Sequence, residues 1–204
     1  MFSSATKIRI QKSLSAFLIF TIFFVQTVQF PFVSSTQAAG GDAPNLVSVI
    51  VSESTNTSEL KSRIKRYADD IQNAMSNTRV IIVEVPDNTS PHNIAALNEK
   101  LFYEGDGNGI SRLVGTVLIG SLPLPVVHSG GDSFLSVFPY TDFDDKVFVY
   151  DAANGYYEAN KASIIRDTPE IWHGVIMPNT GSPEQDRDRL VKFLDKSHDF
   201  YKRE

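Results

Sequence analysis

The 204-residue chain contains no cysteine. This absence excludes disulfides, thiolate metal sites and a thiol nucleophile supplied by the chain itself. The sequence also shows no internal repeat and no low-complexity tract. Its hydrophobic fraction of 42% and its length are those of one ordinary globular domain that follows a targeting segment.

Acidic residues are missing from the first 39 residues, which carry the three basic residues Lys7, Arg9 and Lys12. The whole chain has 19 Lys and Arg, so 16 remain after these three, against 24 Asp and Glu; the formal charge of this remainder is −8. An acidic body without a basic stripe argues against nucleic acid as a partner.

The basic residues at the N-terminus precede an apolar segment, residues 14–25, and small residues follow at 36–40. This order is typical of an export signal, so we predict that residues 1–39 direct export and are cleaved after Ala38 or just beyond it. The alternative is an uncleaved anchor, because residues 14–33 provide the ~20 residues that span a hydrocarbon core. In both cases we expect an extracytoplasmic protein, secreted or at the cell surface, that contacts a membrane only through an uncleaved leader.

After the leader, apolar runs that resemble strands alternate with amphipathic helical segments. Residues 45–52, 79–85 and 113–119 are short and apolar, whereas 59–76 and 90–102 place apolar residues at helical spacing. Runs that are apolar on both faces are typical of interior parallel strands. The order strand, helix, strand, helix, strand therefore predicts an α/β fold with three layers, in which helices flank a mostly parallel sheet.

The sequence changes in character after Pro125. Short aromatic pieces at residues 134–138, 146–150 and 156–157 predict hairpin strands or a long excursion from the sheet. Residues 169–176 predict a fourth core strand, and a last helix is predicted to start from Ser182. We expect the α/β domain, residues 45–204, to have a sheet that is incomplete on its C-terminal side.

The loop that follows the third strand is the first place to look for a ligand. Open parallel sheets bind ligands beyond the carboxyl ends of their strands, and this loop runs from Gly120 to His128. Ser121, His128 and Asp132 are the residue types of a serine triad, but the second glycine of a nucleophile elbow is missing. His173 precedes a glycine, and it is either a general base or a histidine satisfied by the backbone. Ser121, His128 and His173 are therefore candidates for a substrate or ligand loop, and no catalytic residue is assigned.

Acidic residues gather in the segment 140–145. Asp142, Asp144 and Asp145 could supply the several oxygen ligands that calcium requires. The glycine at the sixth position and the terminal glutamate of the usual calcium loop are absent, so a solvated acidic turn is the alternative. Calcium is the one cofactor that the sequence brings into consideration.

Three segments, in this order, resemble the front half of the catalytic domain of gingipain-type cysteine peptidases, peptidase family C25. They are VLIGSLPLP (residues 117–125), PYTDFDD (139–145) and PEIWHGVIMP (169–178), the last leading into RLVKFL (189–194). The resemblance implies a caspase-like fold and hydrolysis of polypeptides by a cysteine thiolate that histidine assists. Val175 departs from the family pattern, which commonly has arginine after the glycine.

In that family the catalytic histidine and cysteine lie on strands that follow the last helix of this chain. The resemblance therefore implies an exported, non-catalytic N-terminal portion of a gingipain-like peptidase, inactive alone, with a polypeptide substrate only if the catalytic half is present. The alternative is a secreted or membrane-anchored binding module without enzymatic activity, with calcium as one candidate ligand. An independent serine hydrolase is the third hypothesis.

Overall fold

A computed structural model describes residues 43–107, 111–144, 146–160 and 168–202. The predicted export signal and the candidate metal ligand Asp145 lie outside the described residues. Within these ranges, no helix combines the length and the apolar character that crossing a bilayer requires.

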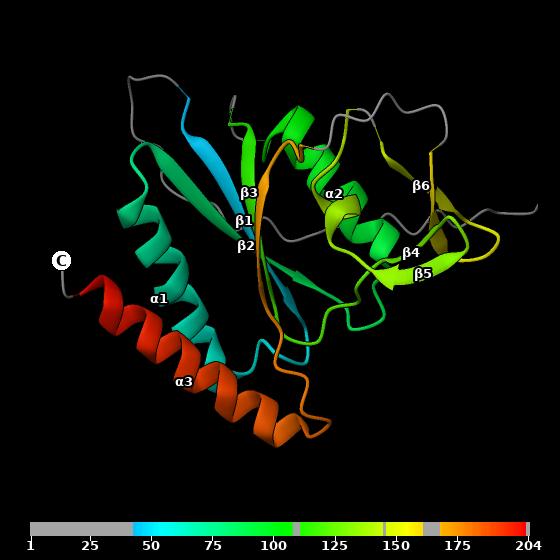
Figure 1. Cartoon of the computed structure of the whole chain (residues 1–204). Coiled ribbons are helices and arrows are strands. Elements are labelled where there is room, and N and C mark those ends of the chain that lie inside the picture. The colour runs from blue at the N-terminus through cyan, green and yellow to red at the C-terminus, as the bar shows by residue number, and fades with distance from the viewer. Residues whose placement is uncertain (1–42, 108–110, 145, 161–167, 203–204) are drawn as a thin grey trace, which may run out of the picture.

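Four parallel strands form the main sheet, in the order β2-β1-β3-β8. They are β1 (Asn45–Ser52), β2 (Thr78–Val85), β3 (Leu113–Ile119) and β8 (Trp172–Ile176). Helices α1 (Ser58–Ala74) and α3 (Pro183–Tyr201) cover one face, and α2 (Pro91–Glu104) covers the other (Figure 1). This arrangement confirms the predicted α/β fold with three layers and a mostly parallel sheet.

The central strand β1 is buried on both faces. Leu46 and Ile50 pack in the cluster on the α2 side, whereas Val47, Val49 and Val51 pack in the cluster with α1 and α3. Apolar contacts on both sides explain why the sequence of this strand lacks polar alternation.

Each α-helix begins after a residue with a side-chain hydroxyl. The hydroxyl oxygens of Thr57, Ser90 and Ser182 accept hydrogen bonds from the backbone N–H group three residues on. These bonds satisfy N–H groups that have no partner inside the helix. Pro91 and Pro183 occupy the first helical positions, where the missing N–H group costs nothing. The sequence therefore locates the starts of α2 and α3.

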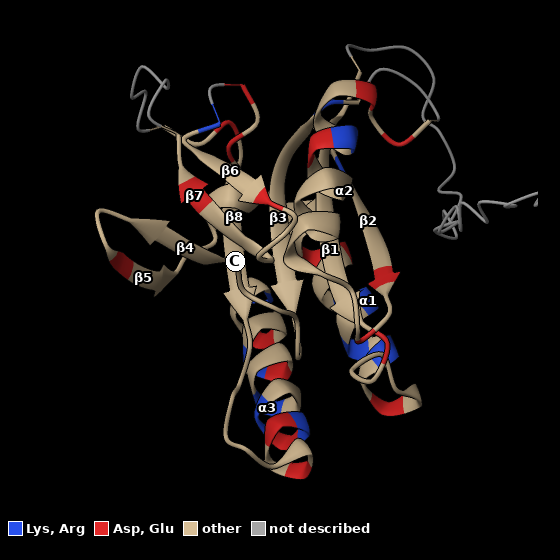
Figure 2. Ribbon diagram, turned by 90° about the vertical axis from the view of Figure 1, so that its right-hand side faces the viewer, with Lys and Arg blue, Asp and Glu red and all other residues tan. Residues whose placement is uncertain are grey.

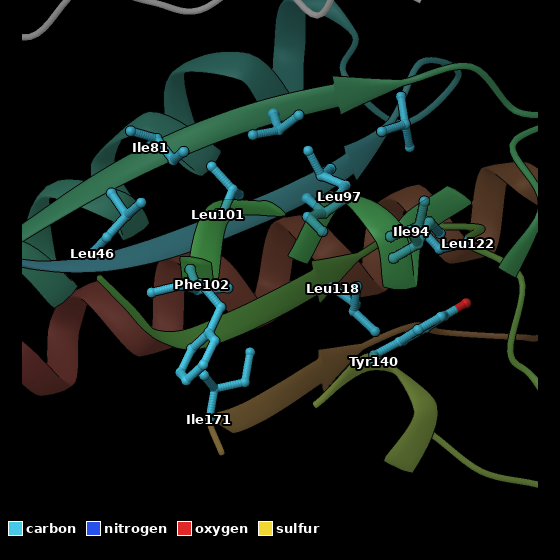
Figure 3. Packing of buried hydrophobic residues seen from close by; sticks show 14 of the residues in the cluster. Leu46, Ile81, Ile94, Leu97, Leu101, Phe102, Leu118, Leu122, Tyr140 and Ile171 are labelled. Carbon is cyan, nitrogen blue, oxygen red and sulfur yellow. The ribbon is translucent and has the colours of Figure 1, made fainter. Parts of the chain in front are cut away.

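One hydrophobic cluster fills the space between the main sheet and α2 (Figure 3). Leu97 and Leu101 of α2 lie in it together with Leu118 of β3. Tyr140 is fully buried in the same cluster, and its hydroxyl donates a hydrogen bond of 2.6 Å to the carbonyl of Pro123. Burial raises the pKa of Tyr140, which keeps the hydroxyl protonated as a donor. This bond ties the segment after β3 to the core.

A second sheet lies on the α2 side of the main sheet, in the order β5-β4-β7-β6 (Figures 1 and 2). Its strands are β4 (Val126–Ser129), β5 (Asp132–Leu135), β6 (Phe148–Asp151) and β7 (Tyr156–Ala159). Two antiparallel hairpins are joined by a short parallel pairing of β4 with β7, so the predicted hairpin excursion is confirmed.

The prediction of a loop from Gly120 to His128 is wrong for its last three residues, 126–128, which belong to β4. Two prolines favoured irregular backbone, but β4 begins directly after the second of them, at Val126. Val126 pairs with Leu135, and hydrogen bonds from such a distant partner leave no signal in the local sequence.

The predicted fourth strand of the main sheet is confirmed as β8, and it lies at the edge of that sheet. Within the described part of the chain, β8 pairs with β3 alone. The side chains of Trp172 and Val175 are 40% and 43% exposed. Trp172 lies over Gly115 of β3, where a Cβ atom would stand 2.0 Å from the indole ring. The apolar sequence of β8 thus specifies a strand but not its neighbours.

Candidate ligand-binding site

The connections after β1 and β3 leave the main sheet toward opposite faces. Val51 and Ile119 are register partners near the carboxyl ends of these two strands. From this edge β1 continues into α1 on one face, and β3 continues toward the second sheet on the other face (Figure 1). Open parallel sheets bind ligands at this kind of switch point.

Gly120 allows the two loops at this edge to lie in close contact. Its φ of +91° is in the left-handed region, and a Cβ atom there would stand 2.0 Å from Oγ1 of Thr55. The hydroxyl of Thr55 is itself held by Ser52, whose Oγ lies 2.7 Å away. Glycine is therefore required both by the backbone conformation and by the neighbouring loop.

A pocket of about 500 Å³ opens beside this contact. Ser54 and Ser121 line it from the loops after β1 and β3, and Glu184 and Arg187 line it from the first turns of α3. The pocket is large enough for a small organic ligand, since such sites usually measure roughly 300–1,000 Å³.

Some polar groups of the pocket maintain the fold, and others remain available. The carboxylate of Asp186 accepts hydrogen bonds from the backbone N–H and the hydroxyl of Thr180, at 2.8 and 2.7 Å. In contrast, no hydrogen bond or ion pair within the described residues engages the hydroxyls of Ser54 and Ser121 or the carboxylate of Glu184. These three groups can serve a ligand.

Arg187 also keeps donors available. Its Nε lies 3.5 Å from Oε2 of Glu59, and its Nη2 lies 3.6 Å from Oδ1 of Asp188. Both distances exceed the roughly 2.7–3.2 Å of an N–H···O hydrogen bond. The side chain is 43% exposed, so a ligand can reach the guanidinium group.

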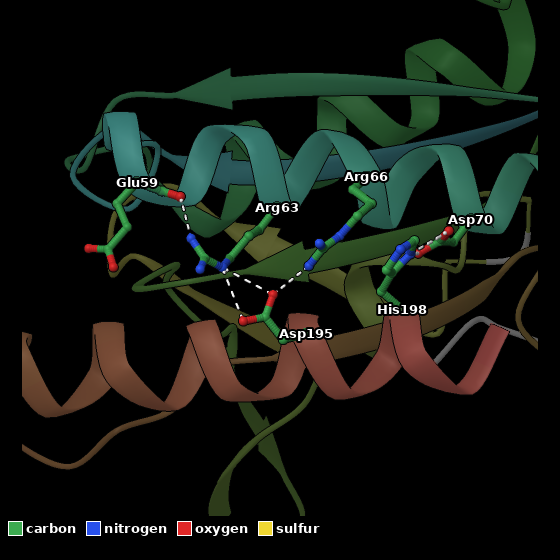
Figure 4. A network of polar contacts seen from close by, with 6 residues as sticks. All are labelled: Glu59, Arg63, Arg66, Asp70, Asp195 and His198. Carbon is green, nitrogen blue, oxygen red and sulfur yellow. Dashed lines mark hydrogen bonds and ion pairs between the residues drawn. The ribbon is translucent and has the colours of Figure 1, made fainter. Parts of the chain in front are cut away.

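A network of ion pairs joins α1 to α3 and fixes the position of the pocket wall (Figure 4). Asp195 of α3 pairs with Arg63, at 3.1 Å, and with Arg66. Burial raises the pKa of Asp195, but hydrogen bonds from Arg66 and Arg63 outweigh it, so that this pKa is lowered. His198 of α3 lies 2.9 Å from Asp70 of α1, and its side chain is only 16% exposed.

Comparison with models of known protein families, with curated proteins and with solved structures found no significant match to this chain. A family assignment therefore stays a proposal.

The structure does not bring the predicted histidines to Ser121. His128 lies on β4 in the second sheet, where its Nδ1 is 3.1 Å from Oγ of Ser133 and its ring packs on Tyr156. His173 is exposed on β8, three residues before the strand ends, which is about 10 Å from the carboxyl edge at ~3.3 Å per residue. No hydrogen bond in the described parts of the chain joins either histidine to Ser121, so the structure lends no support to the serine-hydrolase hypothesis.

Two of the candidate calcium ligands have protein partners. The buried carboxylate of Asp142 accepts a hydrogen bond of 2.6 Å from the backbone N–H of Val147. Asp144 accepts a hydrogen bond from the hydroxyl of Tyr103, and this bond raises the pKa of Tyr103 to about 12. Among the described residues, which omit Asp145, no three His, Asp or Glu side chains are grouped for a metal ion. Calcium binding stays a prediction.

The sequence analysis missed Ser54, Glu184 and Arg187. The two charged residues occupy polar positions of an amphipathic helix, which usually face solvent. A signal was available, because the capping residue Ser182 follows β8 closely and so places the first turn of α3 near the carboxyl edge of the sheet.

Proposed function

We propose that the chain is the exported, non-catalytic N-terminal part of a gingipain-like cysteine peptidase. The observation that supports this proposal is that the three segments that resemble the family are hydrogen-bonded to one another. The first two are joined by the bond of 2.6 Å from the hydroxyl of Tyr140 to the carbonyl of Pro123.

The third segment is bonded to each of the other two. The backbone N–H of Gly120 donates to the carbonyl of Ile176 at 3.0 Å, which joins the first segment to the third. The N–H of Glu170 donates to the carbonyl of Thr141 at 2.9 Å, which joins the second to the third. Segments that are distant in sequence thus contact one another along the paired strands β3 and β8, as one fold element shared with a family would.

In this proposal the chain supplies a scaffold rather than reacting groups. Peptide hydrolysis would require a cysteine thiolate and a histidine from the catalytic half, since this chain has no thiol. The edge strand β8 is a suitable place for the sheet to continue, because Trp172 and Val175 are half exposed there.

The decisive experiment reads the coding DNA beyond the codon for Glu204, in all three frames. We expect it to encode a strand with His-Gly and a strand with a cysteine, and the extended polypeptide should hydrolyse peptide substrates. The matched control replaces that cysteine by alanine and should be inactive. Absence of both strands, or hydrolysis by the purified 204-residue chain alone, would contradict the proposal.

Export has its own test. N-terminal sequencing of the chain recovered outside the cytoplasm should begin after Ala38 or just beyond it, or at the native N-terminus if the leader acts as an anchor. Recovery of the chain in the cytoplasm alone would rule export out.

A ligand-binding module is the second candidate function, and the pocket at the carboxyl edge favours it. The exposed side chains of Ser54, Ser121 and Glu184 line it and have no protein partner in the described structure, so a ligand can reach them. Thermal unfolding with calcium chloride and with a chelator tests the calcium version. A melting temperature that rises with calcium supports calcium binding. Identical melting temperatures in calcium and in chelator would refute it.

A further inference from the structure

Two opposite charges lie one helical turn apart in the wall of the pocket. Glu184 and Arg187 are at positions i and i+3 of α3, so their Cβ atoms are roughly 5–6 Å apart on the same side of the helix. No ion pair joins them to each other, because Arg187 contacts Glu59 and Asp188 instead. The pocket therefore presents a carboxylate and a guanidinium group side by side.

The remaining wall of the pocket is apolar in its depth and carries hydroxyls at its rim. Leu60 and Leu190 also line the pocket, but they are only 2% and 3% exposed, so the protein core already covers most of their apolar surface. Ser54 and Ser121 are exposed and can each donate and accept a hydrogen bond. A peptide group, with one donor and one acceptor, matches these two hydroxyls.

The charge arrangement disfavours simpler ligands. An anion alone would face the carboxylates of Glu184 and Asp186, and a cation alone would face the guanidinium of Arg187. A neutral ligand would displace water from these charges without replacing its hydrogen bonds, which is unfavourable. A ligand with one positive and one negative end satisfies both charges.

We propose that this pocket binds a short peptide with free termini, a dipeptide in the first place. Its ammonium group binds Glu184, its carboxylate binds Arg187, and its peptide group bonds to the hydroxyls of Ser54 and Ser121. This inference rests on the second candidate function, the ligand-binding module, and does not require the peptidase relationship.

Isothermal titration calorimetry of the whole chain with leucyl-leucine tests the inference. N-acetyl-leucyl-leucine lacks the ammonium charge and leucyl-leucinamide lacks the carboxylate, and we expect each to bind about ten- to a hundredfold more weakly. Glu184→Gln should weaken the binding of leucyl-leucine by the same factor. It should change the affinity for N-acetyl-leucyl-leucine by no more than about twofold, because that peptide lacks the ammonium group that would bind Glu184. Arg187→Gln should show the same relation with the amide.

Asp199→Asn is the matched control, since Asp199 is exposed at the other end of α3 and should leave binding unchanged. Blocking the termini alters only the ligand, so the test remains valid even if a variant folds poorly. Equal binding of the free and blocked peptides, or no response to Glu184→Gln and Arg187→Gln, would overturn the inference.

A thermal-shift panel of amino acids, dipeptides, sugars, nucleotides and calcium chloride separates the two levels of the proposal. Binding of a sugar or nucleotide that Ser121→Trp abolishes, with no binding of dipeptides, overturns the peptide inference but keeps the binding module. No shift with any compound overturns both.

Discussion

Replacing Gly120 by alanine tests the contact between the two loops that form the pocket. An L-residue at φ +91° carries backbone strain of about 1–3 kcal/mol. The new Cβ atom would also stand 2.0 Å from Oγ1 and 2.6 Å from Cβ of Thr55, and relieving such overpacking costs about 1–3 kcal/mol. Gly120→Ala should therefore lower the free energy of unfolding by about 2–6 kcal/mol.

Urea unfolding, followed by tryptophan fluorescence, measures this loss. Trp172 is the one tryptophan in the sequence and lies on β8, so its emission reports on the main sheet. With a slope of about 2 kcal/mol per M, the urea midpoint should fall by about 1–3 M.

Two variants separate the backbone strain from the contact with Thr55. Gly130 has a φ of +63°, and no atom lies within 4 Å of the position that its Cβ would take. Gly130→Ala should therefore lower the free energy of unfolding by the backbone strain alone. Thr55→Gly, added to Gly120→Ala, should recover at least about 1 kcal/mol beyond additivity. If Gly120→Ala and Gly130→Ala cost the same within about 0.5 kcal/mol, or the double variant is additive, the close contact is refuted.

Three further changes test the core and the helix network by the same urea assay. Leu118→Ala removes a fully buried side chain and should cost about 2–5 kcal/mol, whereas Leu135→Ala, at a side chain 62% exposed, should stay within about 0.5 kcal/mol. Asn98→Ala leaves the carbonyl of residue 140, to which Asn98 donates at 3.1 Å, without this donor and should cost about 1–3 kcal/mol. The pKa of Asp195 is lowered from 3.8 in the folded chain, so its stabilisation is present above that pH and is lost as the pH falls through the folded-state pKa. Asp195→Asn should therefore lower the free energy of unfolding by at most about 1 kcal/mol at pH 7, because the side chain is 41% exposed, and by less near pH 3. The control Asp199→Asn should show no difference between the two pH values. An equal loss for Asp195→Asn at both pH values would contradict this reasoning.

The layered fold was predictable because its elements leave local signals. The strand β1 is apolar throughout, and the helix α2 begins with the cap Ser90 followed by Pro91. A strand buried on both faces needs a run of apolar residues, and a proline at the first helical position marks where a helix begins. Both signals lie within a few consecutive residues, so they can be read directly from the sequence.

Pairing partners and edges were not predictable in the same way. Val126 belongs to a strand only because Leu135 and β7 lie beside it. Val175 is an apolar residue of the kind that fills interior strands, yet nothing in the sequence shows whether another strand pairs with β8. The pocket was harder to predict, because Glu184 and Ser121 come together only through the packing of α3 against the main sheet.

The two edges of the main sheet differ in how they are protected from other chains. The edge strand β2 carries Arg79 and Glu84, whereas β8 has no charged Lys, Arg, Asp or Glu and no proline between Trp172 and Ile176. Charges and prolines are the usual means by which an exposed strand avoids adding a foreign strand. Concentrated solutions of the chain should therefore associate slowly through β8, and raising the ionic strength should speed this association, because salt screens the repulsion between chains with a formal charge of −5.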